Sequence, residues 1–403
     1  MLKYLKNIAN LQRNGIPAGV YSVCSSNPFV LKTAMLKAKN DNTDLLVEAT
    51  CNQVNQFGGY MGLTPLEFIH YIKNIANEVD FPFHKLTLGG DHLGPYLWRK
   101  ESGTEAMNKA IVLIKEYVKA GFVKIHLDAS MMCVGDPGPP LPIDISAKRA
   151  AQMCMAAEEV LIEGIEPLYV IGAEVPTPGG SLEQENEASV TDHRDVHEFL
   201  EVSKLAFKTY GVENAWERVI AVVVQPGIDF GNREISIYSH DRALNLSLFH
   251  NKLPNIMTYE IHSTDYQPPW AIKQMVRDHF PILKVGPCLT YAFREAVFSL
   301  IDIEEKMLGN RKNVSLSNMR KHLEEAMIKN PVYLKSHNLD KEEYLKWFSL
   351  YDRIRYYWTD EEVEKALSRL IENLSKYDIN PIEIITSKIR EAIDPYTKVF
   401  IDH

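Results

Sequence analysis

Short apolar segments rich in β-branched residues alternate with longer amphipathic segments along this chain, and this alternation constrains the fold more than any other feature. Each apolar segment has the length and composition of a buried strand, and repeated strand–helix units build parallel sheets. The sequence therefore predicts eight parallel strands: Val20–Cys24, Leu45–Thr50, Leu86–Asp91, Val123–Asp128, Tyr169–Val175, Val219–Gln225, Ile256–His262 and Ile282–Gly286.

A helical pattern follows each predicted strand. Eight units over about 290 residues match a (β/α)8 TIM barrel. An open doubly wound sheet is the alternative, but it usually has fewer strands and needs a glycine-rich phosphate loop where this chain has SVCSSNP. The predicted helices are Pro28–Lys39, Pro65–Val79, Thr104–Ala120, Ala147–Gly164, Asp192–Tyr210, His240–Asn251, Pro268–Asp278 and Thr290–Leu308.

Charged helical sequence replaces the strand pattern after about Leu308. We therefore expect a barrel domain over residues 1–308 and a C-terminal α-helical extension over residues 309–403, whose most aromatic segment is SLYDRIRYYW at 349–358. The first fifteen residues form an amphipathic helical pattern without the apolar core of a signal peptide. No run reaches the roughly 18 apolar residues of a membrane span.

Composition narrows the class of protein further. The net charge of −9 argues against general nucleic-acid binding, which needs a clustered basic face. The five cysteines are scattered and form no C-x-x-C pair, so neither a disulfide framework nor a zinc ribbon is indicated. We expect a soluble protein of the reducing cytoplasm.

Polar side chains cluster at the C-terminal ends of the predicted strands, where the active sites of such barrels lie. Asp91 and His92 are adjacent in LGGDHLGP, and an imidazole can hold a divalent metal while a neighbouring carboxylate moves a proton. His262 ends the seventh strand, where period-2 alternation points Glu260 to the same side. We expect His92 and His262 to bind metal and Asp91 to be catalytic. The alternatives are a strand-end cap at Asp91, a satisfied surface histidine at His92 and a core His262 bonded to Glu260.

Three further strand ends supply candidates. Glu174, in GAEVPTPGG, ends an apolar strand and needs a cationic partner, so we expect a metal ligand or an acid/base group. The amide oxygen of Gln225, in VVVQPG, can bind a hard cation or a substrate hydroxyl. Asp128 is the expected second proton-transfer group, unless it and Lys124 simply neutralise each other inside the barrel.

The remaining candidates would contact a polyhydroxylated substrate, because amides and carboxylates hydrogen-bond hydroxyl groups well. They are Glu48, Asn52, Gln53, Asn55, Gln56, His126, Ser263 and Asp265. Thr290 follows the eighth strand, near the usual phosphate position of barrels. Arg353 and Arg355 are also phosphate candidates, for which an interface or packing role is the alternative.

Several motifs taken together resemble a known family. They are SVCSSNP, VEATCNQVNQFGGY, LGGDHLGP, AGFVKIHLDASM, GAEVPTPGG, VVVQPG, EIHSTDYQ, LKVGPCLTYAFREA and SLYDRIRYYW. The combination resembles the D-tagatose-1,6-bisphosphate aldolase accessory-subunit family, whose members are sometimes labelled tagatose-6-phosphate kinases. That family looks like a distant relative of the class II, metal-dependent fructose- and tagatose-bisphosphate aldolases, which are TIM barrels.

The resemblance implies roles for individual residues. In class II aldolases an Asp-His pair at the third strand supplies a catalytic acid and a metal ligand, which carries over to Asp91 and His92. A histidine at the seventh strand carries over to His262. The sixth-strand histidine ligand has its counterpart near Gln225, so this chain departs from the aldolase pattern there. Glu174 would restore a carboxylate to the metal shell.

Two functions follow from the resemblance. The first is C4 epimerisation of ketohexoses or their 6-phosphates, such as fructose and tagatose, by retro-aldol and aldol steps with a divalent ion (Zn, Mn, Co, Ni or Mg). The alternative is a non-catalytic subunit that stabilises a class II tagatose-1,6-bisphosphate aldolase. A kinase is not supported, because no P-loop or kinase glycine loop precedes a helix. Expected partners are a sugar or sugar phosphate, a catalytic aldolase subunit and further copies of the chain.

Overall fold

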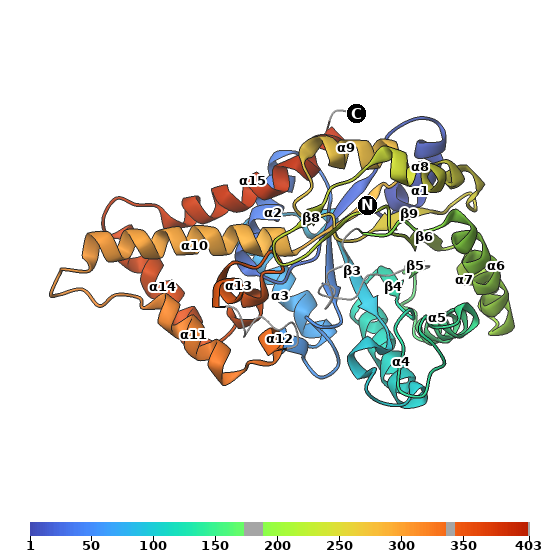
Figure 1. Ribbon diagram of the computed structural model, residues 1–403, viewed down its shortest axis with the longest axis horizontal. Helices are drawn as coiled ribbons and strands as arrows, with labels where there is room; N and C mark the ends of the chain where they lie inside the picture. The colour runs from blue at the N-terminus through green and yellow to red at the C-terminus, as the bar shows by residue number, and fades with distance from the viewer. Residues whose placement is uncertain (173–187, 336–342, 402–403) are drawn as a thin grey trace.

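Eight parallel strands close into a barrel in the computed structural model, which describes residues 1–172, 188–335 and 343–401 (Figure 1). Neighbouring strands follow the chain order around the ring, and the last barrel strand pairs with the first. Each predicted segment overlaps one of these strands, so the TIM-barrel prediction is confirmed. The strands are β1 Val20–Val23, β2 Leu45–Thr50, β3 Leu86–Leu93, β4 Lys124–Leu127, β5 Leu168–Gly172, β6 Val219–Val223, β9 Thr258–Ile261 and β10 Ile282–Val285.

Helices between the strands cover the outside of the barrel. Their starts follow from local sequence: Asn27 accepts hydrogen bonds from the first backbone N–H groups of one helix, and Thr64 forms a capping box with Glu67 in the next. The helices are α2 Pro28–Asn40, α3 Pro65–Glu78, α4 Gly103–Ala120, α5 Ile143–Glu158, α6 His193–Thr209, α8 His240–Phe249, α9 Pro269–Arg277 and α10 Pro287–Leu308.

Three local features differ from the sequence prediction. Helix α5 begins at Ile143, directly after Pro142, and ends at Glu158, whereas the prediction was Ala147–Gly164. A short helix α7 (Glu213–Trp216) precedes β6, and a two-stranded hairpin of β7 (Asp229–Phe230) and β8 (Ile235–Ser236) follows it. Elements this short contain too few residues to show a hydrophobic period, so the pattern could not reveal them.

The N-terminal helix α1 (Leu2–Arg13) closes one end of the barrel. Its buried residues Leu5 and Ile8 belong to an apolar cluster with Leu46 of β2, Leu168 of β5 and other strand residues. The opposite end, where the strands finish, therefore stays available for a binding site.

Helices also make up the described chain after Leu308, and they fold back onto the barrel (Figure 1). The last of them runs beside α10 and also contacts α2 and α9, and within it Tyr396 donates a 2.7 Å hydrogen bond to the Thr264 carbonyl. Among the described residues, no helix is long and apolar enough to cross a lipid bilayer. The elements are α11 Met319–Lys329, α12 Val332–Lys335, α13 Glu343–Phe348, the 3-10 helix η6 Arg353–Tyr357, α14 Glu361–Ser375 and α15 Pro381–Ile401.

One part of this extension reaches the C-terminal end of the barrel. We call residues 349–358 the mouth arm. Ser349 donates a 2.6 Å hydrogen bond to Asn232 in the β7–β8 turn, and Tyr266 donates one of 2.7 Å to the Leu350 carbonyl. Arg294 of α10 forms a buried 3.3 Å ion pair with Asp352. These contacts fix the mouth arm above the strand ends.

A stacked pair of histidines lies beside β9. The rings of His250 and His279 are 4.5 Å apart and nearly parallel, at 8°. Burial lowers the pKa of His250 to about 3, and His279 and Arg13 add to that effect. Folded His250 therefore stays neutral near pH 6.5, where a histidine of the unfolded chain begins to take up a proton.

This histidine predicts a specific loss of stability in acid. In the unfolded chain this histidine binds a proton near pH 6.5, whereas folded His250 does not. Stability that is present above pH 6.5 is therefore lost as the pH falls towards about 3. Between pH 7 and 5, the wild-type free energy of unfolding should fall by about 2 kcal/mol more than that of His250→Gln. Urea unfolding at several pH values measures both. Parallel pH profiles would contradict this.

Candidate functional site

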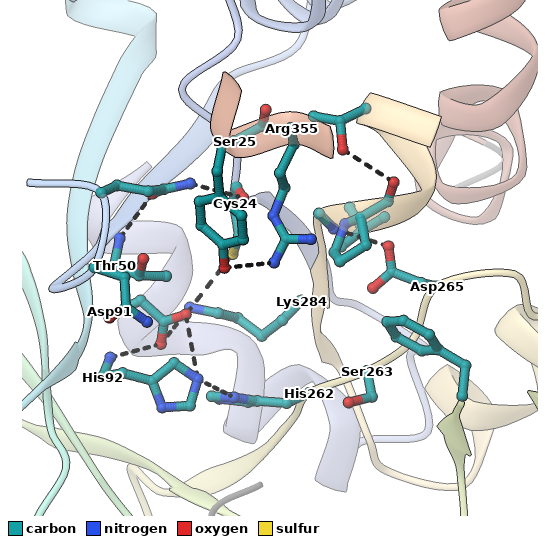
Figure 2. Close-up of a pocket in the computed structure, with 18 of the residues that line it drawn as sticks. Cys24, Ser25, Thr50, Asp91, His92, His262, Ser263, Asp265, Lys284 and Arg355 are labelled. Carbon is teal, nitrogen blue, oxygen red and sulfur yellow. Dashed lines mark hydrogen bonds and ion pairs between the residues drawn. The ribbon is translucent and has the colours of Figure 1, made fainter. Parts of the chain in front are cut away.

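A cavity of about 110 Å³ opens at the C-terminal ends of the strands (Figure 2). Its floor comes from the ends of β3, β9 and β10, its walls from the loops after β1 and β2, and its roof from the mouth arm. Figure 2 shows Asp91, His92 and His262 on one side and Arg355 on the other, with Lys284 between them. Residues from distant parts of the sequence therefore share one cavity.

The glycines of LGGDHLGP are needed for this local structure. A Cβ on Gly89 would lie 2.7 Å from the Glu48 side chain, and one on Gly94 would lie 1.7 Å from the Asp128 carbonyl oxygen. His92 itself has a φ of 49°, a left-handed conformation that is strained for a residue with a Cβ. The chain thus turns sharply at the strand end, and Asp91 and His92 both line the cavity.

Three imidazoles lie close together at the cavity floor, where His92 and His262 line the cavity and His126 is buried beside them. The Nε2 atom of His92 lies 3.1 Å from Nδ1 of His262, and the His126 ring centre lies 5.3 Å from the centres of both other rings. Two nitrogens bound to one tetrahedral ion at ~2.0–2.1 Å would be roughly 3.3 Å apart. The spacing of His92 and His262 therefore suits two ligands of a single cation.

Asp91 is held as an anion beside these rings. Its Oδ1 atom lies 3.0 Å from the His92 backbone nitrogen, 3.0 Å from His126 Nδ1 and 3.1 Å from Lys284 Nζ. Burial alone raises the pKa of Asp91, but Lys284 and the neighbouring histidines outweigh it and hold that pKa well below its usual range. Asp91 is therefore an ionised carboxylate that lines the cavity.

A network of buried charges supports Asp91 from below. Lys124 contacts Glu48 at 2.9 Å and Glu260 at 2.6 Å, and Lys284 contacts Glu48 at 2.7 Å. Burial disfavours the charged form of Lys284, yet Asp91 and the other anions outweigh it and raise its pKa well above the usual value. Lys284 therefore stays protonated and has no lone pair for attack on a carbonyl.

The donor set fits a divalent cation. Asp91, His126, Glu260 and His262 each offer a ligand atom, and these atoms lie within 4.8 Å of one another. Nε2 of His126 is buried and has no hydrogen-bond partner among the described residues, as expected of a nitrogen kept for a ligand. Burial lowers the pKa of His262 to about 4, which keeps its imidazole neutral as metal binding requires.

Asp128 lies behind His92 and does not line the cavity. Its Oδ2 atom is 2.8 Å from His92 Nδ1, and its other oxygen accepts a 2.7 Å hydrogen bond from Ser130. The carboxylate is fully covered, so the structure gives no support to the prediction that Asp128 exchanges protons with a substrate. The geometry instead suits a residue that orients a metal-binding imidazole from behind. His262 Nε2 likewise faces Glu260 at 3.3 Å.

The other two expected metal ligands are Glu174 and Gln225. Glu174 lies outside the described residues. Gln225 is held through its backbone, which exchanges 2.8 Å hydrogen bonds with Thr191, and its side chain does not line the cavity. The Gln225 Oε1 atom is nevertheless buried without a hydrogen-bond partner among the described residues.

The expected substrate contacts divide into two groups. Glu48 is fully buried in its lysine pairs, Asn55 bonds the backbone of its own loop, and Gln56 donates to the Lys109 carbonyl. These three side chains are occupied in holding the fold, which corrects their assignment as substrate contacts. Those that do line the cavity are Asn52, Gln53, Ser263, Asp265, Thr290 and Arg355.

Asp265 occupies the position where barrels commonly bind phosphate. Its Oδ1 atom accepts hydrogen bonds from the backbone N–H groups of Gly286 (3.0 Å) and Cys288 (2.8 Å) at the start of α10. A carboxylate of the chain itself therefore takes the donors that would otherwise bind an anion there. Any phosphate in this cavity has to be bound elsewhere.

Lys284 and Tyr356 are among the cavity residues that sequence reasoning missed. Lys284 interrupts the apolar segment ILKVG, and a charged residue inside a predicted buried strand was a signal for an ionic contact. Tyr356 gave no such signal, because aromatic residues of an α-helical segment usually pack. Arg353 does not line the cavity but donates a 3.2 Å hydrogen bond to the Tyr356 hydroxyl.

Known proteins similar to this chain include both sequence relatives and solved structures. A curated protein named D-tagatose-1,6-bisphosphate aldolase subunit GatZ, from Salmonella paratyphi B (strain ATCC BAA-1250 / SPB7), is 43% identical over 392 residues, covering 95% of this chain and 90% of that protein. A crystal structure from Sinorhizobium meliloti 1021, described as a probable tagatose 6 phosphate kinase, is 35% identical with a TM-score of 0.84, covering 94% of this chain and 100% of that one.

A more distant structure shares the fold alone. Fructose-bisphosphate aldolase from Campylobacter jejuni is 12% identical with a TM-score of 0.50, covering 97% of this chain and 92% of that one. The model of one family, D-tagatose-1,6-bisphosphate aldolase subunit GatZ/KbaZ-like, matches residues 5–398. With nearly the whole sequence matched, this chain belongs to the GatZ/KbaZ-like family of D-tagatose-1,6-bisphosphate aldolase subunits.

Proposed function

We propose that this chain is a subunit of a tagatose-1,6-bisphosphate aldolase and assembles with a catalytic class II aldolase chain. The observation that carries this proposal is the 43% identity, over 95% of the chain, to a protein named as such a subunit.

The subunit role predicts an effect on a second protein. Adding the purified chain to a catalytic tagatose-1,6-bisphosphate aldolase chain should lengthen the half-life of its triose-releasing activity several-fold, because binding to the native form stabilises it. Asp91→Asn should stabilise the partner equally well, since the change is confined to the cavity. A partner whose half-life and sedimentation are unaffected would contradict the subunit role.

The cavity favours a second function, in which the chain itself acts on a ketohexose or its phosphate by C4 epimerisation. The specific observation is the ionised Asp91 in an open cavity with His92 and His262, next to the buried ring of His126. Burying so many charged groups, and polar atoms without hydrogen-bond partners, costs free energy. Such clusters are typical of active sites. Packing alone does not require them.

In this mechanism His92, His126 and His262 would hold a divalent cation, while Asp91 and Glu260, the carboxylates of the donor group described above, would stay paired with Lys284 and Lys124. Glu174 and Gln225 remain proposed ligands. The cation would supply positive charge that polarises the C2 carbonyl of the ketose. Asp91 stays available for proton transfer, and the adjacent Lys284 ammonium keeps its carboxylate ionised.

The chemistry runs through a cleavage and a re-joining. Asp91 removes the C4 hydroxyl proton, the C3–C4 bond breaks, and its electron pair forms an enediolate over C2 and C3 while C4 becomes an aldehyde. The aldehyde turns, C3 attacks its other face, and the C4 alkoxide takes up a proton. The product is the C4 epimer, with no net gain or loss of atoms.

A phosphate group of the substrate would lie against the mouth arm. Arg355 lines the cavity with Thr290 and Ser25 nearby, whereas Asp265 already occupies the backbone donors of α10. A guanidinium binds phosphate through paired N–H donors. Arg355 is therefore the proposed phosphate ligand, and Arg353 supports it from outside the cavity.

Metal binding can be tested without any substrate. The purified chain should bind about one Zn²⁺ or Mn²⁺ by titration calorimetry, and His262→Ala should weaken that affinity by about 100-fold or more because a ligand is lost. His250→Gln, at a buried histidine outside the cavity, is the matched control and should bind like wild type. Unchanged affinity in His262→Ala would rule out this site.

The proton-transfer role has its own test. Asp91→Asn keeps the shape of the side chain but removes its basicity, so metal-dependent conversion of fructose 6-phosphate should fall by about 100-fold or more while metal stays bound. Asp278→Asn is the control, since that buried carboxylate bonds Tyr238 (2.7 Å) and His240 (2.8 Å) away from the cavity. Near-normal turnover in Asp91→Asn would disprove the role.

A further inference from the structure

We propose that Tyr356, in the mouth arm, is a second proton-transfer group of the cavity and exchanges the proton of the C4 hydroxyl on the face opposite Asp91. This inference rests on the epimerase activity proposed above and explains how inversion is completed. Tyr356 would exchange a proton with the sugar itself and would therefore be a catalytic residue.

Inversion at C4 creates the need for such a group. After the C3–C4 bond opens, the aldehyde must turn so that its oxygen points to the other side before the bond re-forms. A carboxylate fixed in the floor can reach the oxygen in one orientation only, because proton transfer needs a separation of about 3 Å. A second carrier is therefore required on the roof side, and Asp128 cannot serve because it lies behind His92.

Tyr356 is held in position by its neighbours in the roof. Its ring stacks on Tyr333 with 4.2 Å between centres at 11°, and it meets the Tyr60 ring edge-on at 4.8 Å and 87°. Tyr356 is buried and lines the cavity with Asp91 and His262. A fixed aromatic side chain that presents its polar end to a cavity is well placed to act on a bound ligand.

Two guanidinium groups bond the Tyr356 hydroxyl. Arg353 donates a hydrogen bond of 3.2 Å and Arg355 one of 3.0 Å, and the second is drawn as a dashed line from Arg355 in Figure 2. Both bonds use the oxygen as acceptor, so the phenolic hydrogen remains available for donation to a ligand. When that hydrogen leaves, two positive charges already face the phenolate oxygen.

The charges around this phenol set it apart from the other tyrosines. Burial raises the pKa of Tyr356, but Arg355 and then Arg353 outweigh it, and the net shift is downward from the usual 10.0. The groups facing it are these two arginines, the phenols Tyr60, Tyr96 and Tyr333, and Asp91 and Lys284 across the cavity.

The comparison with its neighbours is direct. Burial raises the pKa of Tyr60, of Tyr333 and of Tyr357, the next residue in the chain. An acid whose pKa lies nearer to neutrality transfers protons more effectively in both directions. Tyr356 is thus the phenol of the roof with the environment of an acid/base group.

The proposed step balances as follows. When C3 attacks the turned aldehyde, the new C4 alkoxide takes the phenolic proton of Tyr356, and the phenolate electron pair stays on the tyrosine oxygen between the two guanidinium groups. Asp91 holds the proton removed in the opening half. Water then takes the proton from Asp91 and returns one to Tyr356, which restores both groups for the next turnover.

The test compares Tyr356→Phe with Tyr357→Phe. Tyr357→Phe is a matched control because it also removes one phenolic hydroxyl from the helix η6. That hydroxyl donates to the Asn330 carbonyl (2.8 Å) outside the cavity. With Mn²⁺ and fructose 6-phosphate, Tyr356→Phe should lose about 100-fold or more in kcat, with KM changed less than about three-fold. Tyr357→Phe should keep wild-type kcat. A role in packing alone would change the two variants alike.

A second measurement needs no turnover. Ultraviolet difference titration of wild type against Tyr356→Phe should show one tyrosinate forming below pH 10. If the wild type converts the sugar and the Tyr356→Phe rate lies within about three-fold of the wild-type rate, the role of Tyr356 is wrong, while the epimerase proposal stands. No tyrosinate below pH 10 overturns it as well. If wild type converts no sugar with any of the five metals, the epimerase proposal fails, and the catalytic role of Tyr356 fails with it.

Discussion

The ionic network inside the barrel is the constraint on which the cavity depends. Lys124 and Lys284 lie among the carboxylates of Glu48, Glu260 and Asp91, all shielded from water. Removing either lysine would leave three buried carboxylates facing a single cation, and breaking a buried ion pair in this way costs about 3–5 kcal/mol. The network therefore fixes the height and orientation of Asp91 and, through it, of the histidine cluster. The charged residues of the cavity floor therefore depend on one another and can hardly be substituted one at a time.

The roof follows a different principle. The mouth arm is held by aromatic contacts, hydrogen bonds to the β7–β8 turn and one buried ion pair, that of Arg294 with Asp352. It brings the Arg355 guanidinium and the Tyr356 phenol to a cavity whose floor contains carboxylates and imidazoles, and Arg353 supports the phenol from outside the cavity. Opposite walls thus carry complementary charge, which is the arrangement expected around a substrate with hydroxyl groups in the middle and an anionic end.

The sequence predicted the barrel well because eight apolar segments and their intervening helices repeat a simple period. It also indicated Asp91, His92 and His262, since the ends of parallel strands meet on one face of a barrel. It could not show that Glu48 is occupied by Lys124 and Lys284, because such pairs join strands that are far apart in the chain. Nor could it separate Asp128 from the cavity, since which side of a neighbouring ring a carboxylate reaches is set by packing.

The mouth arm has one more consequence. Within the described residues, floor, walls and roof of the cavity all belong to a single polypeptide, even though the roof is encoded some 260 residues after the first floor residues. Each copy of the chain therefore supplies the described floor, walls and roof itself. Assembly with another protein and the contents of this cavity can consequently vary independently during evolution, so that a lineage can lose one without dismantling the other.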